Sequence, residues 1–363
     1  MRIAVLGVGL IGGSIGLAAR ARAEADVCGY DPDPGVRARA LELGAIDSAA
    51  ESVGEAVRGA DAVFAAAPVG VLPAVVAEAL GAAGPDCVIS DVGSTKRLLA
   101  DASADARFVG GHPLAGAETE GVEHAREDLF DGASWYLTPA RGSTAGVLYE
   151  RLHALLRRLG ARPVAIDAET HDRLMACISH LPHVLANLLA GQAAGVLSGP
   201  DRPGGDAERL PAVGPSFRDA IRVAGTNSAI WRDIYLSNAD ALSAAITELE
   251  GRLRAVREML GRGEAGAVGD WIEGAREDRD ALLGAGMTGG SANELRVQVP
   301  NRPGVVAEIA LALGEAGVNI GDLVLSPSPD NSRGVIALWI GGQEAAARAE
   351  AILAGLGFQV VRA

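Results

Sequence analysis

Three glycines near the N-terminus have the spacing of a dinucleotide-binding loop. Gly7, Gly9 and Gly12 follow the apolar run RIAVLG and precede an alanine-rich segment, which predicts a strand, a tight turn and a helix. The first glycine permits the turn, the second lets a pyrophosphate approach the backbone, and the third allows close helix packing. We therefore expect this loop, with Leu10 and Ile11 between its glycines, to bind a dinucleotide.

A carboxylate at the end of the next predicted strand indicates which dinucleotide binds. Asp31 ends the run DVCGYD and lies where an acidic side chain would accept a hydrogen bond from a ribose 2′-hydroxyl. The same carboxylate would repel a 2′-phosphate, so NAD is the expected cofactor rather than NADP. A glycine-rich turn that binds no nucleotide is the alternative.

His112 is the candidate base. In an open parallel sheet, ligands bind beyond the carboxyl ends of the strands, and Pro68, Ser94 and His112 each follow such a run. An imidazole there could take a proton from a substrate hydroxyl while hydride leaves the carbon. A lone histidine is often structural, but the two glycines before His112 and the proline after it favour catalysis.

Lys96 is the single lysine of the chain, in the stretch SDVGSTKRLL. It follows Ser94, at the expected mouth of the crevice, where an ammonium group could bind an anionic substrate. We expect Lys96 to act in substrate binding rather than proton transfer, and a surface lysine without function is the alternative.

The elements that position these residues predict three domains. Seven short strands alternate with helices up to about residue 167, which is typical of an α/β fold with a doubly wound, Rossmann-like parallel sheet. An all-helical domain is expected at 168–286, and a βαββαβ module at 293–363. The helical domain contains a periodic apolar seam that calls for a partner helix, formed by Leu242, Ile246, Leu249, Leu253, Val256 and Leu260.

Composition excludes several classes of partner. The formal net charge of −14 leaves no basic surface for nucleic acid or an anionic membrane. Cys28, Cys87 and Cys177 form no CxxC pair and are expected to be reduced thiols. The apolar N-terminus imitates a signal peptide, but its glycines fit a phosphate loop better. With no continuous apolar stretch of about 18 residues, the protein is expected to be soluble and cytoplasmic.

Together these motifs resemble the prephenate dehydrogenase family, which includes arogenate dehydrogenases. The resemblance covers nearly the whole chain and rests on motifs in the family's order. They are VLGVGLIGGSIG, DVGSTK, FVGGHPLAGAETEGVEHA, HDRLMACISHLPHVLANLL, FRDAIRVAGTNSAIWRDIYLSN and NRPGVVAEIALALGEAGVNI. The last of them is similar to an ACT domain, a regulatory module that often binds amino acids.

The resemblance implies an oxidative decarboxylation and the residues that perform it. His112 would take the C4 hydroxyl proton of prephenate as hydride passes to NAD, and Ser94 would orient the histidine and the nicotinamide. Arg222, paired with Asp219 on one helical face, would grip the ring carboxylate. The remaining implied substrate-site residues are His183 in the pocket wall, His180 in support of it, and Glu118 as a gate.

Two further expectations concern metal and regulation. His180 and His183 have an i, i+3 spacing, but Pro182 kinks the segment and no further ligand lies nearby in sequence, so no metal is expected. The resemblance to ACT domains implies an amino-acid effector, with tyrosine as the hypothesis. The apolar seam and the exposed sheet edge of the small terminal module predict a homodimer that meets through the helical domain. The effector residues would be Asn301, Pro303, Gly304, Asn319 and Ile320.

Three alternative functions remain open from the sequence. An arogenate dehydrogenase differs only in an amine on the substrate side chain, which one or two pocket residues could select. A β-hydroxyacid dehydrogenase would need a catalytic lysine in the helical domain, and the chain has none there. A sensor that binds NAD and an amino acid would need no catalysis at all.

Overall fold

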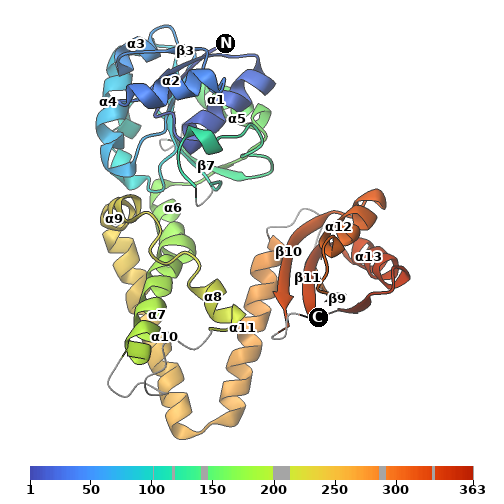
Figure 1. Ribbon diagram of the computed structural model, residues 1–363. Coiled ribbons are helices and arrows are strands. Elements are labelled where there is room, and N and C mark those ends of the chain that lie inside the picture. Colours follow the sequence, from blue (N-terminus) through green and yellow to red (C-terminus); the bar gives the residue numbers. More distant parts are fainter. Residues whose placement is uncertain are drawn as a thin grey trace. The chain divides into compact units, whose positions relative to one another are not determined.

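The computed structural model describes residues 1–100, 102–116, 119–139, 146–198, 213–285, 292–328 and 332–362. These residues form two compact units, Met1–Leu249 and Glu250–Ala363 (Figure 1). The three domain boundaries expected from the sequence remain a prediction.

A five-stranded parallel sheet forms the centre of the first unit. Its order is β3-β2-β1-β4-β5, so the direction of chain progression reverses between β1 and β4. The strands are β1 (Arg2–Leu6), β2 (Asp26–Tyr30), β3 (Ser48–Ala49), β4 (Ala62–Ala65) and β5 (Val88–Asp91). This is the expected parallel sheet, with β3 as a short edge strand that the sequence pattern did not indicate.

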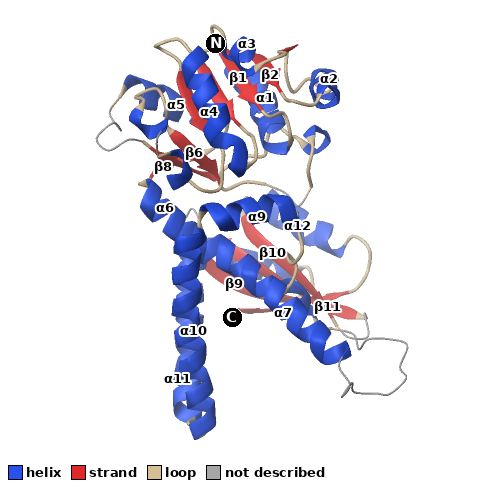
Figure 2. Ribbon diagram, turned by 90° about the vertical axis from the view of Figure 1, so that its left-hand side faces the viewer, coloured by secondary structure: helices blue, strands red, loops and turns tan. Residues whose placement is uncertain are grey.

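Helices cover both faces of this sheet (Figure 2). One face packs against α1 and α5, and the other packs against α3 and α4. The first group comprises α1 (Leu10–Ala23) and α5 (Val147–Arg158), and the second α3 (Val53–Val57) and α4 (Leu72–Ala82), while α2 (Pro34–Glu42) follows β2. Because the helices after β1 and β4 lie on opposite faces, a crevice opens at the carboxyl ends of these two strands.

The last three strands of this region depart from the expected pattern. The strands β6 (Gly110–Pro113), β7 (Ser134–Thr138) and β8 (Arg162–Ala165) form a separate sheet, in which β6 and β7 are antiparallel. One parallel bridge, between Ile89 and Phe108, connects this chain segment to β5. The sequence indicated all three strands, but strand propensity does not distinguish a parallel partner from an antiparallel one.

A helical region follows β8. It comprises α6 (Ala168–Met175), one π-helical turn (Ala176–His180), α7 (Leu181–Ser198), α8 (Pro215–Ala220), α9 (Ser228–Ser237), α10 (Ala239–Arg262) and α11 (Ala265–Ala285). The helical stretch Ala168–Val196 is long and apolar enough to cross a membrane, contrary to the sequence expectation, and 28% of its most apolar part is buried. Length and composition alone are weak evidence for a membrane span, because a helix of a soluble protein can meet the same test.

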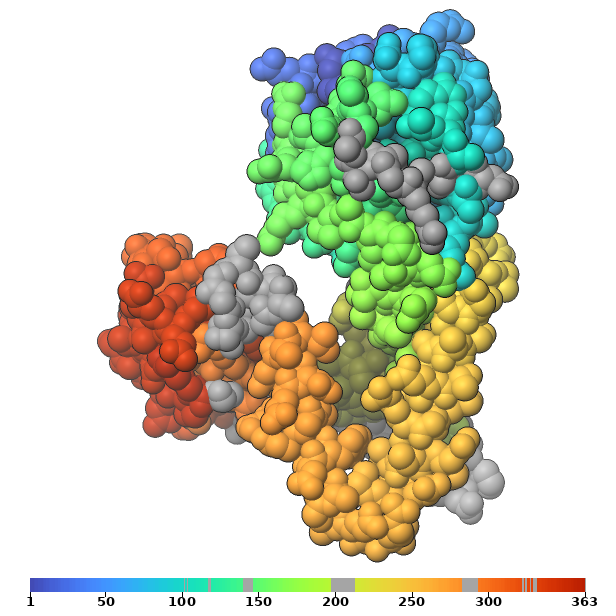
Figure 3. All heavy atoms as spheres, turned by 180° about the vertical axis from the view of Figure 1, so that it is seen from behind, coloured from blue at the N-terminus to red at the C-terminus, as the bar shows by residue number. Residues whose placement is uncertain are grey.

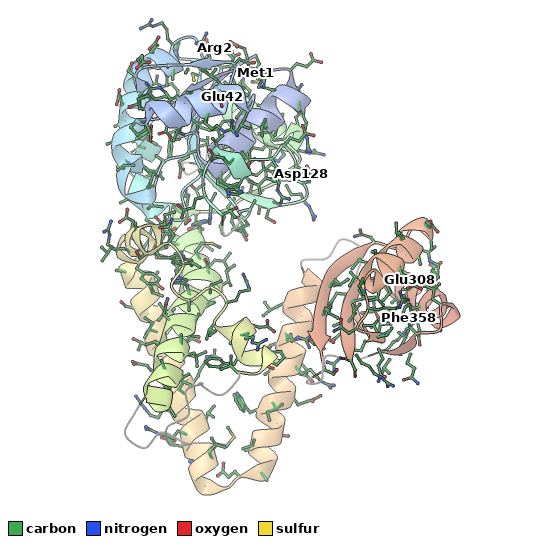
Figure 4. The ribbon with its side chains drawn as sticks, in the orientation of Figure 1. Met1, Arg2, Glu42, Asp128, Glu308 and Phe358 are labelled. Carbon is green, nitrogen blue, oxygen red and sulfur yellow. The ribbon has the colours of Figure 1, made fainter. Side chains whose placement is uncertain are left out.

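The C-terminal module has the expected βαββαβ order. Its sheet, β10-β11-β9-β12, is antiparallel throughout. The elements are β9 (Ala292–Pro300), α12 (Val305–Glu315), β10 (Ile320–Pro327), β11 (Arg333–Gly341), α13 (Gln343–Gly355) and β12 (Gln359–Arg362). Both helices pack on one face of the sheet, where their side chains and the partly buried Phe358 form a core (Figure 4).

Candidate active site

The glycine loop is shaped by close backbone approach. Gly7 has a φ of 97°, and a side chain there would overlap the Ala66 carbonyl that follows β4. A Cβ on Gly12 would overlap the carbonyl oxygen of Gly7. A Cβ on Gly9, the N-cap of α1, would meet no atom of the described chain within 4 Å. The helix N-terminus and the open space beside Gly9 therefore suit a pyrophosphate group.

The other predicted cofactor residues surround the same crevice. Asp31 lies directly after β2, and its carboxylate accepts hydrogen bonds from the N–H groups of Val8 and Asp33, both at 3.1 Å. Leu10 and Ile11 begin α1, and Pro68 is exposed in the segment after β4. The position of Asp31 is compatible with the predicted contact to an unmodified ribose, and that role remains a prediction.

The structure corrects the expected position of Lys96. Its side chain is fully buried, and its ammonium group donates to the Asp91 carboxylate and, at 2.6 Å, to the Gly111 carbonyl oxygen. Burial lowers the pKa of Lys96, and the charge of Asp91 opposes this effect. Lys96 therefore does not lie exposed at the mouth of the crevice, and a compact ammonium group fits this enclosed space where the wider guanidinium of arginine would not.

The Asp91–Lys96 pair holds the peptide immediately before the candidate base. Asp91 accepts from the Gly111 N–H at 3.0 Å, while Lys96 donates to the Gly111 carbonyl oxygen. A side chain on Gly111 would collide with the Asp91 carbonyl and with Ser90. The glycine before His112 is thus required by this close packing.

The ring of His112 is held by a second buried group. His112 Nδ1 lies 2.9 Å from His171 Nε2, and His171 Nδ1 lies 2.8 Å from Asp172 Oδ1. His171 and Asp172 are completely buried on α6, and His112 is half-buried on β6. The three side chains form a continuous hydrogen-bonded chain from the crevice into the protein.

The electrostatic surroundings of these three side chains favour an unprotonated His112. Burial lowers the pKa of His112 well below its ordinary value, and nearby His171, Lys96 and His180 act in the same direction. Burial alone would raise the pKa of Asp172, but hydrogen bonds from His171 and from the backbone of Arg97 and Lys96 outweigh it, so this pKa falls. The site thus combines a neutral imidazole with a buried carboxylate.

Asp172 also joins the nucleotide-binding part to the helical part. It accepts from the backbone N–H of Lys96 at 2.8 Å and from that of Arg97 at 3.0 Å. The Arg97 side chain contacts Asp172, Asn238 and Asp240. The loop after β5 is therefore attached to α6 and to the start of α10.

A second cluster lies farther along the helices, around His183. Its ring stacks on Trp231 with centroids 3.7 Å apart, and it hydrogen-bonds to Tyr235 and Thr226. These residues border a pocket of about 360 Å³ whose lining is His183, Asn187, Gly225, Thr226, Ser228, Trp231, Arg232, Tyr235 and Leu236. His183 thus lies in a pocket wall.

His180 lies at the end of the π-helical turn. It is buried, its Nδ1 lies 3.2 Å from the amide nitrogen of Asn238, and its ring meets Trp231 edge-on. Burial lowers the pKa of His180 to about 4. A neutral ring at this position fits packing and hydrogen bonding better than proton transfer.

The structure places the predicted catalytic residue Ser94 and the predicted substrate residues Arg222 and Glu118 differently. The helix α8 ends at Ala220, so Arg222 lies in the following turn and does not share a helical face with Asp219. Ser94 is half-buried after β5, and among the described residues it makes no hydrogen bond to His112. Glu118 lies outside the described residues.

The residues expected to bind an effector lie on the C-terminal module. Asn301, Pro303 and Gly304 are exposed between β9 and α12, where Gly304 has a φ of 86° and forms the N-cap of the helix. Asn319 is exposed and Ile320 begins β10. All five belong to the two connections that the sequence indicated, and effector binding remains a prediction.

Sequence reasoning missed His171 and Asp172. Both lie in the motif HDRLMACISHLPHVLANLL, but adjacent polar residues at the start of a helix look like an ordinary helix terminus. The available signal was their position directly after the strand β8, in a helix that begins beside the crevice. Only the fold shows that these residues face His112.

The glycine loop, the Asp31 carboxylate and the half-buried His112 are typical of one class of protein, a dinucleotide-dependent oxidoreductase with a helical second part. Residues 15–165 match the family described as prephenate dehydrogenase, nucleotide-binding domain. Residues 167–273 match prephenate dehydrogenase, dimerization domain, and residues 293–342 match the ACT domain. The chain belongs to the prephenate dehydrogenase family, and it is an NAD-dependent oxidoreductase.

Two relatives agree with this assignment. A prephenate dehydrogenase of Bacillus subtilis is 32% identical over 357 residues, which cover 96% of this chain and 94% of the relative. A cyclohexadienyl dehydrogenase of Zymomonas mobilis is 34% identical over 291 residues, covering 77% of this chain and 94% of the relative.

Two solved structures share the fold. The prephenate dehydrogenase of Aquifex aeolicus, in complex with hydroxyphenyl propionate and NAD+, has a TM-score of 0.70 and 27% identity, covering 78% of this chain and 98% of that one. The arogenate dehydrogenase of Synechocystis has a TM-score of 0.67 and 26% identity, covering 78% of this chain and all of the other.

The buried position of Lys96 leads to a stability prediction. Lys96→Met should lower the free energy of unfolding by about 3–5 kcal/mol, because it leaves the Asp91 carboxylate buried without its counter-ion. Urea denaturation measures this change. Arg173→Met, which alters an exposed cation on α6, is the control and should stay within about 0.5 kcal/mol. An unchanged stability with a raised KM would instead support a substrate-binding lysine.

Proposed function

We propose that the chain oxidises prephenate to 4-hydroxyphenylpyruvate with NAD+, as a step toward tyrosine. The observation that carries the proposal is the half-buried His112 on β6, held by His171 and by the Gly111 peptide at the edge of a dinucleotide crevice. A non-enzymatic sensor would not need a half-buried, unprotonated imidazole in this position. We also propose that the protein acts in the cytoplasm, as expected for a soluble biosynthetic enzyme.

The reaction needs one base and at least one cation. His112 takes the proton of the C4 hydroxyl while the hydrogen on C4 leaves with its electron pair. Bound NAD+ supplies the hydride acceptor. The bond between C1 and its carboxylate then breaks, carbon dioxide leaves, and the electron pair of that bond restores the aromatic ring. The low pKa of His112 supports its role, because a base must be unprotonated when the substrate arrives.

Arg222 is proposed to bind the ring carboxylate, with His183 in the wall of the same site. Arg222 is exposed in the turn that leads to Gly225 and Thr226, and both of these residues border the His183 pocket. A guanidinium beside this pocket would supply the positive charge that an acidic protein otherwise lacks. Ser94 and Glu118 retain the orienting and gating roles that the family resemblance implies.

Arogenate is the second candidate substrate. The structural relative from Synechocystis is an arogenate dehydrogenase, and the Zymomonas relative is a cyclohexadienyl dehydrogenase. Both substrates share the ring on which the proposed base acts. The preference between the two substrates therefore depends on whether the pocket binds the side-chain ketone of prephenate or the side-chain amine of arogenate more tightly. We propose prephenate as the preferred substrate.

We propose a homodimer because apolar side chains on the helices α7 and α10 are exposed to solvent in the single chain. Leu253 and Leu260 of the seam on α10 are 58% and 62% exposed, and Leu188 on α7 is 62% exposed. On the face drawn in Figure 3, side chains of the stretch coloured yellow to orange, which includes α10, form part of the open surface. A second copy of this helical region is the natural cover for these side chains.

The first functional prediction concerns the base. With prephenate and NAD+, the protein should produce the absorbance of NADH, and His112→Asn should lower kcat by about 10²–10⁴ with KM within severalfold. Steady-state kinetics on prephenate and on arogenate measure both constants. A fully active His112→Asn would refute the mechanism, and the absence of any signal with either substrate would favour a sensor.

Arg222→Ala tests binding separately from chemistry. It should raise KM for prephenate with a much smaller change in kcat, because it removes an interaction shared by the ground state and the transition state. Arg173→Ala, on the exposed side of α6, should leave both constants unchanged. A lower kcat at constant KM would mean that Arg222 acts on the reaction itself.

Cofactor choice should depend on Asp31. The unmutated protein should prefer NAD+ over NADP+ by a large factor, since the carboxylate repels a 2′-phosphate. Asp31→Ser removes this repulsion and should narrow the preference, as measured by the ratio of kcat/KM for the two cofactors. Equal use of both by the unmutated protein would contradict the assignment.

The proposed dimer can be tested with one added charge. Leu253→Glu should shift the mass measured by light scattering from dimer to monomer at micromolar concentration, because it buries a carboxylate in the apolar seam. Ala255→Glu adds the same charge about 200° around the helix and should leave the dimer intact. A monomeric unmutated protein at this concentration would exclude the dimer.

Tyrosine is proposed to inhibit through the C-terminal module. A chain ending near residue 291 should lose this inhibition, because it lacks the exposed N-terminus of α12 that would bind an amino-acid carboxylate. Rates with and without tyrosine, compared between the two chains, measure the effect. Equal inhibition would mean that tyrosine acts at the active site as a product analogue.

A further inference from the structure

The hydrogen bonds behind His112 have a defined direction. Asp172 is a buried carboxylate with a lowered pKa, so its oxygens can only accept. The nearest ring atom, His171 Nδ1 at 2.8 Å, must therefore carry a hydrogen. When His171 is neutral, its Nε2 has the lone pair and can accept a hydrogen bond from His112 Nδ1, which lies 2.9 Å away.

This direction determines which nitrogen of His112 can act as the base. If Nδ1 of His112 carries the hydrogen, its Nε2 has the free lone pair. We propose that His171, oriented by Asp172, is a positioning residue that holds His112 in the Nδ1–H tautomer and so presents Nε2 to the substrate. The proposal deepens the function proposed above and rests on His112 being the base.

The hydrogen-bonded series His112–His171–Asp172 would also stabilise His112 after it accepts a proton. The imidazolium that forms donates through Nδ1 to His171, and the negative charge of Asp172 lies one ring farther away. Burial by itself makes this cation unfavourable, so a carboxylate linked through a hydrogen-bonded ring offsets part of the cost. Asp172 cannot turn away easily, because both of its oxygens accept from the backbone of Lys96 and Arg97.

The surroundings of His171 are consistent with this role. Its ring contacts His112 of β6 edge-on at a centroid distance of 5.1 Å and Tyr136 of β7 at 5.6 Å. The Lys96 ammonium group donates to Asp91 and to the Gly111 carbonyl oxygen, and His180 hydrogen-bonds to Asn238. Each neighbouring polar group therefore has its own partner, and Nε2 of His171 remains available to His112.

A pair of substitutions separates positioning from packing. His171→Leu removes the acceptor and should lower kcat by about 10²–10⁴ with KM for prephenate within severalfold, the scale expected for a misoriented base. His171→Gln provides an amide oxygen that can accept from His112 Nδ1, and it should restore kcat to within about tenfold of the unmutated enzyme. Equal loss in both variants, or full activity of the leucine variant, would overturn the proposal.

The tautomer can be measured directly in the unmutated enzyme. The chain has six histidines, so ¹⁵N-labelled histidine gives a small set of ring signals, and the His112 signal is identified by its loss in His112→Asn. His112 should appear as the Nδ1–H tautomer in the unmutated enzyme and in His171→Gln. An Nε2–H tautomer in the unmutated enzyme would overturn the proposal even if the leucine variant fails to fold.

This measurement also separates the two proposals. If His112→Asn is fully active, His112 is not the base, whatever its tautomer. If His112→Asn is inactive and His112 is found as Nε2–H, the base is correct and the role given to His171 is wrong.

Discussion

The site depends on the buried carboxylate of Asp172. Without partners, a charge in that position would cost several kcal/mol, so its acceptor capacity must be satisfied. Hydrogen bonds from His171 and from the backbone of Lys96 and Arg97 satisfy it. These partners come from α6 and from the loop after β5, so satisfying one charge connects the helical part to the nucleotide-binding sheet.

His112 is held from two directions as a consequence. Its ring nitrogen meets His171, while the peptide before it is held by Asp91 and Lys96. Lys96 belongs to both attachments, because its backbone N–H contacts Asp172 and its side chain contacts Asp91. The base proposed here must stay within about 3 Å of a substrate hydroxyl, and this double attachment would hold it there.

The apolar seam of the helical region changes in exposure along α10. The first residue of the seam, Leu242, is buried, whereas Leu253 and Leu260 are exposed. The beginning of α10 is therefore packed within its own chain, and the exposed leucines farther along the helix are the surface on which the proposed dimer rests. Family membership agrees, since residues 167–273 match a dimerization domain.

The sequence by itself determined the features that follow from local spacing. Gly7, Gly9, Gly12 and Asp31 predicted a nucleotide loop, because turn geometry and strand ends depend on residues only a few positions apart. The βαββαβ order of the last module could be predicted from the sequence for the same reason.

Tertiary structure decided which distant groups meet. The sequence could not show that Lys96 is buried against Asp91, or that His171 meets His112 across 59 positions of the chain. It also could not show that β6 and β7 run antiparallel, or that α8 ends before Arg222. Such outcomes depend on burial and on the pairing of polar groups, which are set by packing between segments rather than by the order of residues within one segment.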